Sequence, residues 1–255
     1  MGDVYFISDI HIGAGDTEKE QEKLEHLFSF FNYIEKPGNK LFIVGDLFDF
    51  WFEYKHVVPN KYYRLFFRFS KLIEQGVEIH FLPGNHDYWI RDFFEQEIGF
   101  IVHQETYQTE IDGVRFFLFH GDGVSKKDKG YQLLKKVFRN PVNIFLYRLL
   151  HPDLGVPLAS FSSHTSRKHT ANKILNDEAD YLEYAVDKFK KGFDCVIMGH
   201  SHNPLIEKVD GKYLINLGDW IDNFTYGLFS NGKISLNYWK IKNETSNSKL
   251  QPARK

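Results

Sequence analysis

Short apolar segments alternate with amphipathic segments along most of the chain. Segments rich in β-branched and aromatic residues predict strands. The first five predicted strands are 4–8, 41–44, 77–82, 114–119 and 195–198. Between them, apolar residues recur at helical spacing over 17–36 and 61–76, and Gly76 stands where a helix C-cap is expected. This alternation of strands and helices is typical of an α/β fold.

The pattern changes after the fifth strand to closely spaced strand segments without long helices between them. These segments are 205–209, 213–216, 226–229 and 234–240. Their spacing predicts an antiparallel meander. We therefore expect one domain over residues 1–243, followed by a polar, disordered tail over 244–255 that has too few apolar residues to build a core.

Each of the first five strands is followed by a short segment that carries carboxylate, imidazole or amide side chains. These residues are Asp9 and His11, Asp46 and Asp49, Asn85, His86 and Asp87, His120 and Asp122, and His200 and His202. Taken singly, Asp9 or Asp46 could be a helix N-cap, and Gly84-Asn85 could be a hairpin turn. Five of the twelve histidines fall in these segments, however. Because ligands bind outside the carboxyl ends of strands in α/β sheets, the set predicts one shared site.

The chemistry of these side chains indicates a metal centre. Oxygen and imidazole ligands without a thiolate suit divalent Mn, Fe, Co, Ni or Zn. The candidate ligands are Asp9, His11, Asp46, Asn85, His120, His200 and His202. Seven are too many for one ion and fit two ions that share a carboxylate. Two ions ~3.5–4 Å apart can clamp both oxygens of a phosphoryl displacement and lower the pKa of a water, so no protein nucleophile is needed.

The order and spacing of these motifs resemble the calcineurin-like metallophosphoesterases over roughly residues 3 to 240. The resemblance implies a four-layer αββα sandwich, with two packed β-sheets between helices. It implies that Asp9, His11 and His202 hold one metal, that Asn85, His120 and His200 hold the other, and that Asp46 bridges them. It also implies two divalent ions, with Mn²⁺ favoured over Fe²⁺ and Zn²⁺.

Three residues beside these ligands have expected supporting roles. His86 follows the ligand Asn85 and is placed to protonate the leaving-group oxygen as a general acid. Asp87 is expected either to orient that imidazole or to cap the following segment. Asp49 is expected to steady His11 or another imidazole rather than to bind metal.

Finer features resemble the UDP-2,3-diacylglucosamine hydrolase family of lipid A biosynthesis. They are the segments GDLFDFW, HGD, GHSHNP and NLGDW, and a long insertion between Gly123 and Asp194. The resemblance implies cleavage of the pyrophosphate of a lipid-linked UDP-sugar to UMP and 2,3-diacylglucosamine 1-phosphate. Many members have Arg where this chain has His86. The alternatives are a cytosolic phosphodiesterase or phosphatase that acts on a nucleotide or other soluble ester, and, less favoured, a scaffold without catalysis.

The insertion, at about 125–190, predicts a helical cap over the metals. Pro141 and Pro152 divide its apolar segment into short helices. For most of its apolar residues we favour packing on the domain; the alternative is an exposed face that takes acyl chains or contacts a membrane. Side chains over 133–150, Phe145 and Leu149 among them, are then expected to line a groove. Arg167 and Lys168 are expected to bind the diphosphate, unless that segment is only the start of a helix.

Composition narrows the partners. Lys and Arg number 32 against 34 Asp and Glu, a net charge of −2, so no global positive field favours nucleic acid. The single cysteine, Cys195, excludes an intrachain disulfide. The sequence shows no apolar leader and no segment long enough to span a membrane. We expect a cytoplasmic enzyme with peripheral contact to the inner face of the cell membrane.

Overall fold

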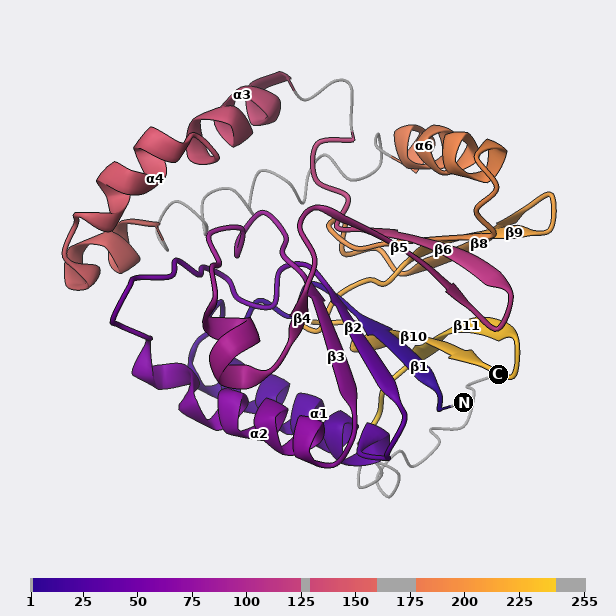
Figure 1. The fold of residues 1–255 in the computed structure, drawn as a ribbon, viewed down its shortest axis with the longest axis horizontal. Coiled ribbons are helices and arrows are strands. Elements are labelled where there is room, and N and C mark those ends of the chain that lie inside the picture. Colours follow the sequence, from indigo (N-terminus) through magenta and orange to yellow (C-terminus); the bar gives the residue numbers. More distant parts are fainter. Residues whose placement is uncertain (1, 125–128, 160–177, 242–255) are drawn as a thin grey trace, which may run out of the picture.

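Two β-sheets pack face to face, and helices cover their outer faces (Figure 1). The computed structural model describes residues 2–124, 129–159 and 178–241. The arrangement has four layers and confirms the predicted αββα sandwich.

The first sheet combines a parallel half with an antiparallel hairpin. Its order is β11 (Lys233–Tyr238), β10 (Thr225–Ser230), β1 (Val4–Ile7), β2 (Lys40–Val44), β3 (Glu78–Leu82) and β4 (Ile101–Val102). Strands β1 to β4 run parallel, while β10 pairs antiparallel with β1 and with β11. Its outer face is covered by α1 (Thr17–Ile34), the short η1 (Asn60–Tyr62), α2 (Tyr63–Glu74) and the π-helical turn η2 (Phe94–Ile98).

The second sheet has the order β5 (Thr106–Ile111), β6 (Val114–Phe119), β7 (Cys195–Met198), β9 (Lys212–Asn216) and β8 (Leu205–Val209). Strands β6, β7 and β9 run parallel, and β5 and β8 pair antiparallel at the two edges. Helix α6 (Glu178–Lys190) packs on its outer face through Tyr181, Ala185 and Phe189. Five strands whose carboxyl ends carry polar residues are thus divided between two sheets: β1, β2 and β3 in one, β6 and β7 in the other.

The core lies in three layers, of which the middle one joins the sheets. There, Phe6 of the first sheet stacks on Phe42 and on Phe116 of the second, with ring centroids 5.2 Å and 5.8 Å apart. Because these strands are buried on both faces, their sequences read as continuous apolar segments rather than as alternating ones.

Local sequence explains where the helices begin and end. Asp16 caps α1 by accepting a hydrogen bond from the backbone N–H of Lys19 at 3.0 Å. Gly76 has a φ of +85° and donates its N–H to the Ile73 carbonyl at 2.9 Å, which confirms it as the glycine that ends α2.

The predicted meander is wrong. Strands β8 and β9 form a hairpin in the second sheet, whereas β10 and β11 form a hairpin in the first. The chain changes sheets between β9 and β10, and neither spacing nor periodicity contains information on which sheet a hairpin joins. Strands β4 and β5 were also not predicted. β4 has only two residues, and β5 is the polar edge segment TYQTEI.

The cap consists of α3 (Lys129–Phe138), α4 (Pro141–Arg148) and a third helix over 152–159, which lie apart from the two sheets at upper left in Figure 1. Pro141 opens α4, and the Asn140 side chain accepts the N–H of Val142 at 2.9 Å, so the predicted break is confirmed. The expectation that most apolar cap residues pack on the domain is wrong, since α4 has no buried residue and Leu149 is 68% exposed.

Within the described ranges no helix is long and apolar enough to span a membrane. Parts of the predicted cap (125–128 and 160–177) and the predicted tail lie outside the described residues. The last part of the predicted cap, 178–190, is α6 and packs on the second sheet, so that boundary of the cap is wrong.

Candidate metal centre

The carboxyl ends of β1, β2 and β3 meet those of β6 and β7 at one edge of the sandwich. Backbone hydrogen bonds join the segments that follow: Asp9 N–H to Gly45 O at 3.1 Å, His11 N–H to Asp46 O at 2.9 Å, and Gly199 N–H to His120 O at 3.0 Å. The seven predicted ligands and His86 all lie at this edge. Three groups have ligand atoms within 4.8 Å of one another: Asp9, His11 and His202; His11, Asp46 and His86; Asp46, His120 and His200.

The backbone of this edge is held in a conformation that few residues adopt. Five of the seven predicted ligands have a left-handed φ, between +48° and +70°: Asp9, His11, Asp46, His200 and His202. For a residue other than glycine this costs of order 1–3 kcal/mol, and such strain concentrates at functional sites. Two glycines permit the close approach: a Cβ on Gly84 would overlap the Asp46 carboxylate, and one on Gly199 would overlap that of Asp9.

The first group surrounds one oxygen of Asp9. Its Oδ2 accepts hydrogen bonds from Ser8 Oγ at 2.7 Å and from the His200 N–H at 2.8 Å. Its Oδ1 is buried, has no hydrogen-bond partner among the described residues, and lies 3.6 Å from His11 Nε2 and 3.4 Å from His202 Nε2. A buried carboxylate oxygen without a donor is costly, and this oxygen together with the two imidazole nitrogens beside it fits a divalent cation.

The second group is built around Asp46 and His120. Since a carbonyl only accepts, His120 Nδ1 donates to Val44 O at 3.0 Å, which leaves Nε2 facing the centre. That Nε2 lies 3.2 Å from Asp46 Oδ2 and 3.2 Å from Asn85 Oδ1. Asp46 Oδ2 also lies 3.6 Å from His11 Nε2, so this carboxylate stands between the two groups.

Electrostatics prepare these groups to bind cations. Burial alone would raise the pKa of Asp46, but the charges of His120 and His86 outweigh it and hold that pKa well below its usual value. Burial lowers the pKa of His11 and of His200 to about 4, so both rings are neutral near pH 7. Burial would also lower the pKa of His120, but Asp46 raises it well above normal. The His120 ring therefore carries a second proton, on Nε2, and a divalent cation beside Asp46 would displace it, as metals do at imidazole ligands.

Asp49 and Asp87 support the ligand loops. Asp49 Oδ1 lies 3.8 Å from His11 Nδ1, which agrees with the expectation that it steadies this imidazole. Asp87 has a role that neither expectation anticipated. Its Oδ2 accepts the N–H groups of Leu47 and Phe48, at 2.7 and 3.3 Å, and its Oδ1 accepts that of Gly84 at 2.7 Å. It therefore ties the loop after β2 to the loop after β3.

Asp219 also belongs to this site and was not predicted. Its Oδ2 lies 3.6 Å from His202 Nδ1, and its Oδ1 accepts the backbone N–H groups of residues 221, 222 and 223 at 2.8 to 3.1 Å. Partners of this kind fix the orientation of a metal-binding imidazole. The signal was present, because Asp219 follows β9 in the segment NLGDW much as the predicted residues follow their strands.

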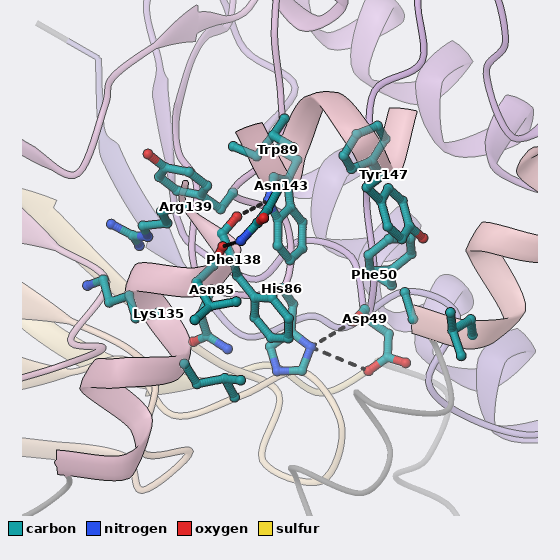
Figure 2. A pocket seen from close by; sticks show the side chains of 17 residues that line it. Asp49, Phe50, Asn85, His86, Trp89, Lys135, Phe138, Arg139, Asn143 and Tyr147 are labelled. Carbon is teal, nitrogen blue, oxygen red and sulfur yellow. Dashed lines mark hydrogen bonds and ion pairs between the residues drawn. The ribbon is translucent and has the colours of Figure 1, made fainter. Parts of the chain in front are cut away.

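A pocket of about 630 Å³ lies between this centre and the cap (Figure 2). Asn85 and His86 form part of its wall. Much of the rest is aromatic. Phe138 and Tyr147 come from the segment 133–150 that was expected to line a groove, whereas Phe50, Phe52, Tyr88 and Trp89 were not predicted. Trp89 also donates its Nε1–H to the Phe138 carbonyl at 2.9 Å and so attaches α3 to the loop after β3.

One expectation about the pocket is wrong, and a second concerns residues that the structure does not describe. Phe145 and Leu149 do not line it; they are 58% and 68% exposed. Arg167 and Lys168 lie outside the described residues. The Lys and Arg residues in the pocket wall, among those described, are Lys135 of α3 and Arg139, which directly follows this helix.

Comparison with known proteins agrees with this geometry. The model of the calcineurin-like phosphoesterase family matches residues 2–204. Three relatives are each named UDP-2,3-diacylglucosamine hydrolase. The protein of Porphyromonas gingivalis is 32% identical and aligns over 91% of this chain and 96% of its own length. That of Nitrosococcus oceani is 30% identical, over 85% and 86%, and that of Hahella chejuensis is 29% identical, over 87% and 91%.

The chain belongs to the calcineurin-like phosphoesterase family. It is a metal-dependent hydrolase of phosphoric ester or pyrophosphate bonds, and the family implies divalent metals. The buried, unpartnered Asp9 oxygen and the converging imidazoles fit such ions.

The position of Asp46 predicts the metal content of variants. Asp46→Asn keeps the shape and tolerates the left-handed backbone but removes the charge, so we expect the affinity for both ions to fall by more than about 100-fold. Asn85→Ala should weaken chiefly one ion. Metal titration followed by elemental analysis measures this, with the exposed turn variant Asp210→Asn as the control. Unchanged affinity in Asp46→Asn, or a parent enzyme that holds one ion after full loading, would contradict the shared role.

Proposed function

We propose that this enzyme hydrolyses the pyrophosphate of UDP-2,3-diacylglucosamine to UMP and 2,3-diacylglucosamine 1-phosphate. The observation that carries the proposal is the aromatic pocket, which opens directly beside Asn85 and His86. The active edge is built from Asp, His and Asn and offers no surface for an acyl chain, whereas the pocket does. The names of the three relatives agree with this substrate.

Two divalent ions, with Mn²⁺ favoured, complete the proposed centre. Asp9, His11 and His202 would hold one ion; Asn85, His120 and His200 would hold the other, with Asp46 between them. When bound, the ions supply positive charge for the phosphate oxygens and lower the pKa of water at the centre. The protein contributes the fixed orientation of each ligand. The Val44 carbonyl orients the ring of His120, Asp49 lies beside the ring of His11, and Asp219 lies beside the ring of His202.

His86 is the proposed proton donor to the leaving group. Its Nδ1 donates to the Asp49 carbonyl at 2.7 Å, so its Nε2 faces the centre, 3.9 Å from Asp46 Oδ2. The ring also forms part of the pocket wall, where the leaving group would lie. A proton carried on Nε2 would therefore be within reach of an oxygen that departs toward the pocket.

The outer face of the cap supports contact with a lipid surface. It exposes large apolar side chains, which include Leu133, Val142, Phe145, Leu149 and Leu154. The described cap residues 129–159 contain five Lys or Arg and one Asp, although the whole chain carries a net charge of −2. Helices that combine exposed apolar residues with basic ones bind to anionic membrane surfaces. We propose that this face meets the inner leaflet while the pocket receives an acyl chain.

UMP release tests the function. Purified, metal-loaded enzyme is given UDP-2,3-diacylglucosamine in mixed micelles, bis(p-nitrophenyl) phosphate and p-nitrophenyl phosphate. We expect UMP in equal amount to the lipid 1-phosphate and a kcat/KM at least about 100-fold above that for either soluble ester, because each buried methylene contributes about 0.8 kcal/mol. Absence of UMP together with efficient hydrolysis of a soluble ester would favour the alternative of a soluble phosphoesterase.

The role of His86 predicts a dependence on the leaving group. His86→Ala should keep its metals and lose about 10²–10⁴-fold in turnover on a diester with an unactivated phenol. The loss should be much smaller with p-nitrophenol, which departs without a proton. Steady-state rates over a series of phenols measure this dependence. An equal loss over the series would refute a proton-donor role for this residue.

Variants of two neighbouring residues of α4 test the pocket and the outer face of the cap independently. Ile144 lines the pocket and Phe145 does not. Ile144→Asp should raise KM for the lipid substrate in micelles by about 10-fold or more, equivalent to two lost methylene contacts, and leave bis(p-nitrophenyl) phosphate hydrolysis unchanged. Phe145→Asp should instead weaken sedimentation with vesicles that contain anionic lipid. If Ile144→Asp lowers both activities together with the melting temperature, the pocket is ordinary core and not an acyl site.

A further inference from the structure

Lys135 of α3 and Arg139, the residue directly after this helix, both contact the carboxylate of Asp122 beside the metal centre. Lys135 Nζ lies 2.6 Å from Asp122 Oδ2, and Arg139 Nη2 lies 3.2 Å from the same oxygen. Asp122 follows His120 by two residues, and its side chain is only 8% exposed. Figure 2 shows Lys135 and Arg139 on the side of the pocket where Asn85 lies, with Phe50 and Tyr147 opposite.

These contacts do not use up the cations. A lysine has three N–H donors and an arginine five. Toward described residues, Lys135 uses two, on Asp122 Oδ2 and on the Asp122 carbonyl at 3.1 Å. Arg139 also pairs with Glu105, but that carboxylate is 64% exposed, and such surface pairs contribute little. Asp122 and Glu105 together balance the two positive charges, but Lys135 and Arg139 keep N–H donors at the pocket wall beyond those that bond to described residues.

The attachment of α3 does not rest on these cations alone. The Trp89 Nε1–H bonds to the Phe138 carbonyl, and the Trp89 and Phe138 rings meet edge to face at 5.9 Å. Arg139 also lies over the Tyr88 ring at 4.0 Å. Its guanidinium is therefore oriented by an aromatic face as well as by the Asp122 carboxylate, an arrangement suited to binding phosphate in a fixed geometry.

We propose that Lys135 and Arg139 bind the second phosphate of a diphosphate substrate, the one that departs, and thereby select diphosphates over simple esters. The proposal rests on the proposed function for its substrate class. Both residues line the same pocket as Asn85 and His86, so a phosphate attached to the reacting one extends toward them.

The reaction gives this phosphate a reason to need cations. When the P–O–P bond is hydrolysed, the oxygen of water forms a bond to one phosphorus atom. The bond between this phosphorus and the bridging oxygen breaks at the same time. The electron pair stays on the bridging oxygen, where negative charge develops until the proton of His86 reaches it; one proton of water then restores His86 through the solvent, and the other passes to the buffer. Cations placed beforehand at that oxygen stabilise the charge as it develops.

Inhibition by free nucleotides tests the subsite without any lipid. For the parent enzyme, Ki values of UMP and UDP are measured against bis(p-nitrophenyl) phosphate, and the ratio of the two reports the contribution of the second phosphate. We expect Lys135→Met and Arg139→Met each to reduce this ratio by about 10-fold, and to lower kcat/KM for the diacylated substrate by about 10- to 100-fold. Hydrolysis of bis(p-nitrophenyl) phosphate should change less than about 3-fold.

Two controls separate phosphate binding from attachment of the cap. Lys136→Met removes an exposed charge of the same helix that does not line the pocket, and Glu105→Gln removes an ion pair of Arg139 outside the pocket; neither should alter the UMP-to-UDP ratio. An unchanged ratio in Lys135→Met and Arg139→Met overturns the proposal. If lipid turnover falls while the ratio stays unchanged, the two residues act by attaching the cap or by binding an anionic phospholipid headgroup, and the proposal is overturned as well. Failure of the parent to release UMP would overturn the proposed function instead, while the nucleotide ratio would still stand or fall independently.

Discussion

The rest of this site depends on the contacts of the buried Asp46 carboxylate with the imidazoles around it. It is buried between imidazoles from three different loops, and its Oδ1 accepts the His86 backbone N–H at 2.9 Å. Its position requires Gly84 opposite, because a Cβ there would overlap it. It also requires a left-handed backbone at Asp46 itself. A carboxylate buried so deeply stays ionised only because His120 and His86 outweigh the cost of burial.

Both sheets contribute predicted ligands to the site. The first sheet supplies the ligands that follow β1, β2 and β3, and the second supplies those that follow β6 and β7. The stacked rings of Phe6, Phe42 and Phe116 between the sheets therefore help to set the distance between ligands that lie far apart in the sequence. A tightly packed layer transmits small shifts, so the metal centre is as rigid as the contact between the sheets.

The cap adds what the metal edge lacks. Carboxylates and imidazoles can bind ions and phosphate but offer no apolar surface, and the aromatic pocket under α3 and α4 provides it. The same helices expose further large apolar side chains that do not line the pocket, Phe145 and Leu149 among them. Two apolar faces on short helices cannot both be buried in one small domain, and the structure assigns the inner one to the pocket and leaves the outer one to solvent.

The sequence alone determined which side chains form the site. Asp9, His11, Asp46, Asn85, His120, His200 and His202 each follow a buried strand, and parallel strands place their carboxyl ends at one edge, so these residues could be named before any coordinates. The same rule, applied to β9, would also have found Asp219. Tertiary structure alone decided the partners: that Asp87 joins two loops, that β8–β9 and β10–β11 belong to different sheets, and that Ile144 faces the pocket while Phe145 faces outward. A periodic pattern records that a face is apolar, but what covers that face is decided by contacts with residues distant in the chain.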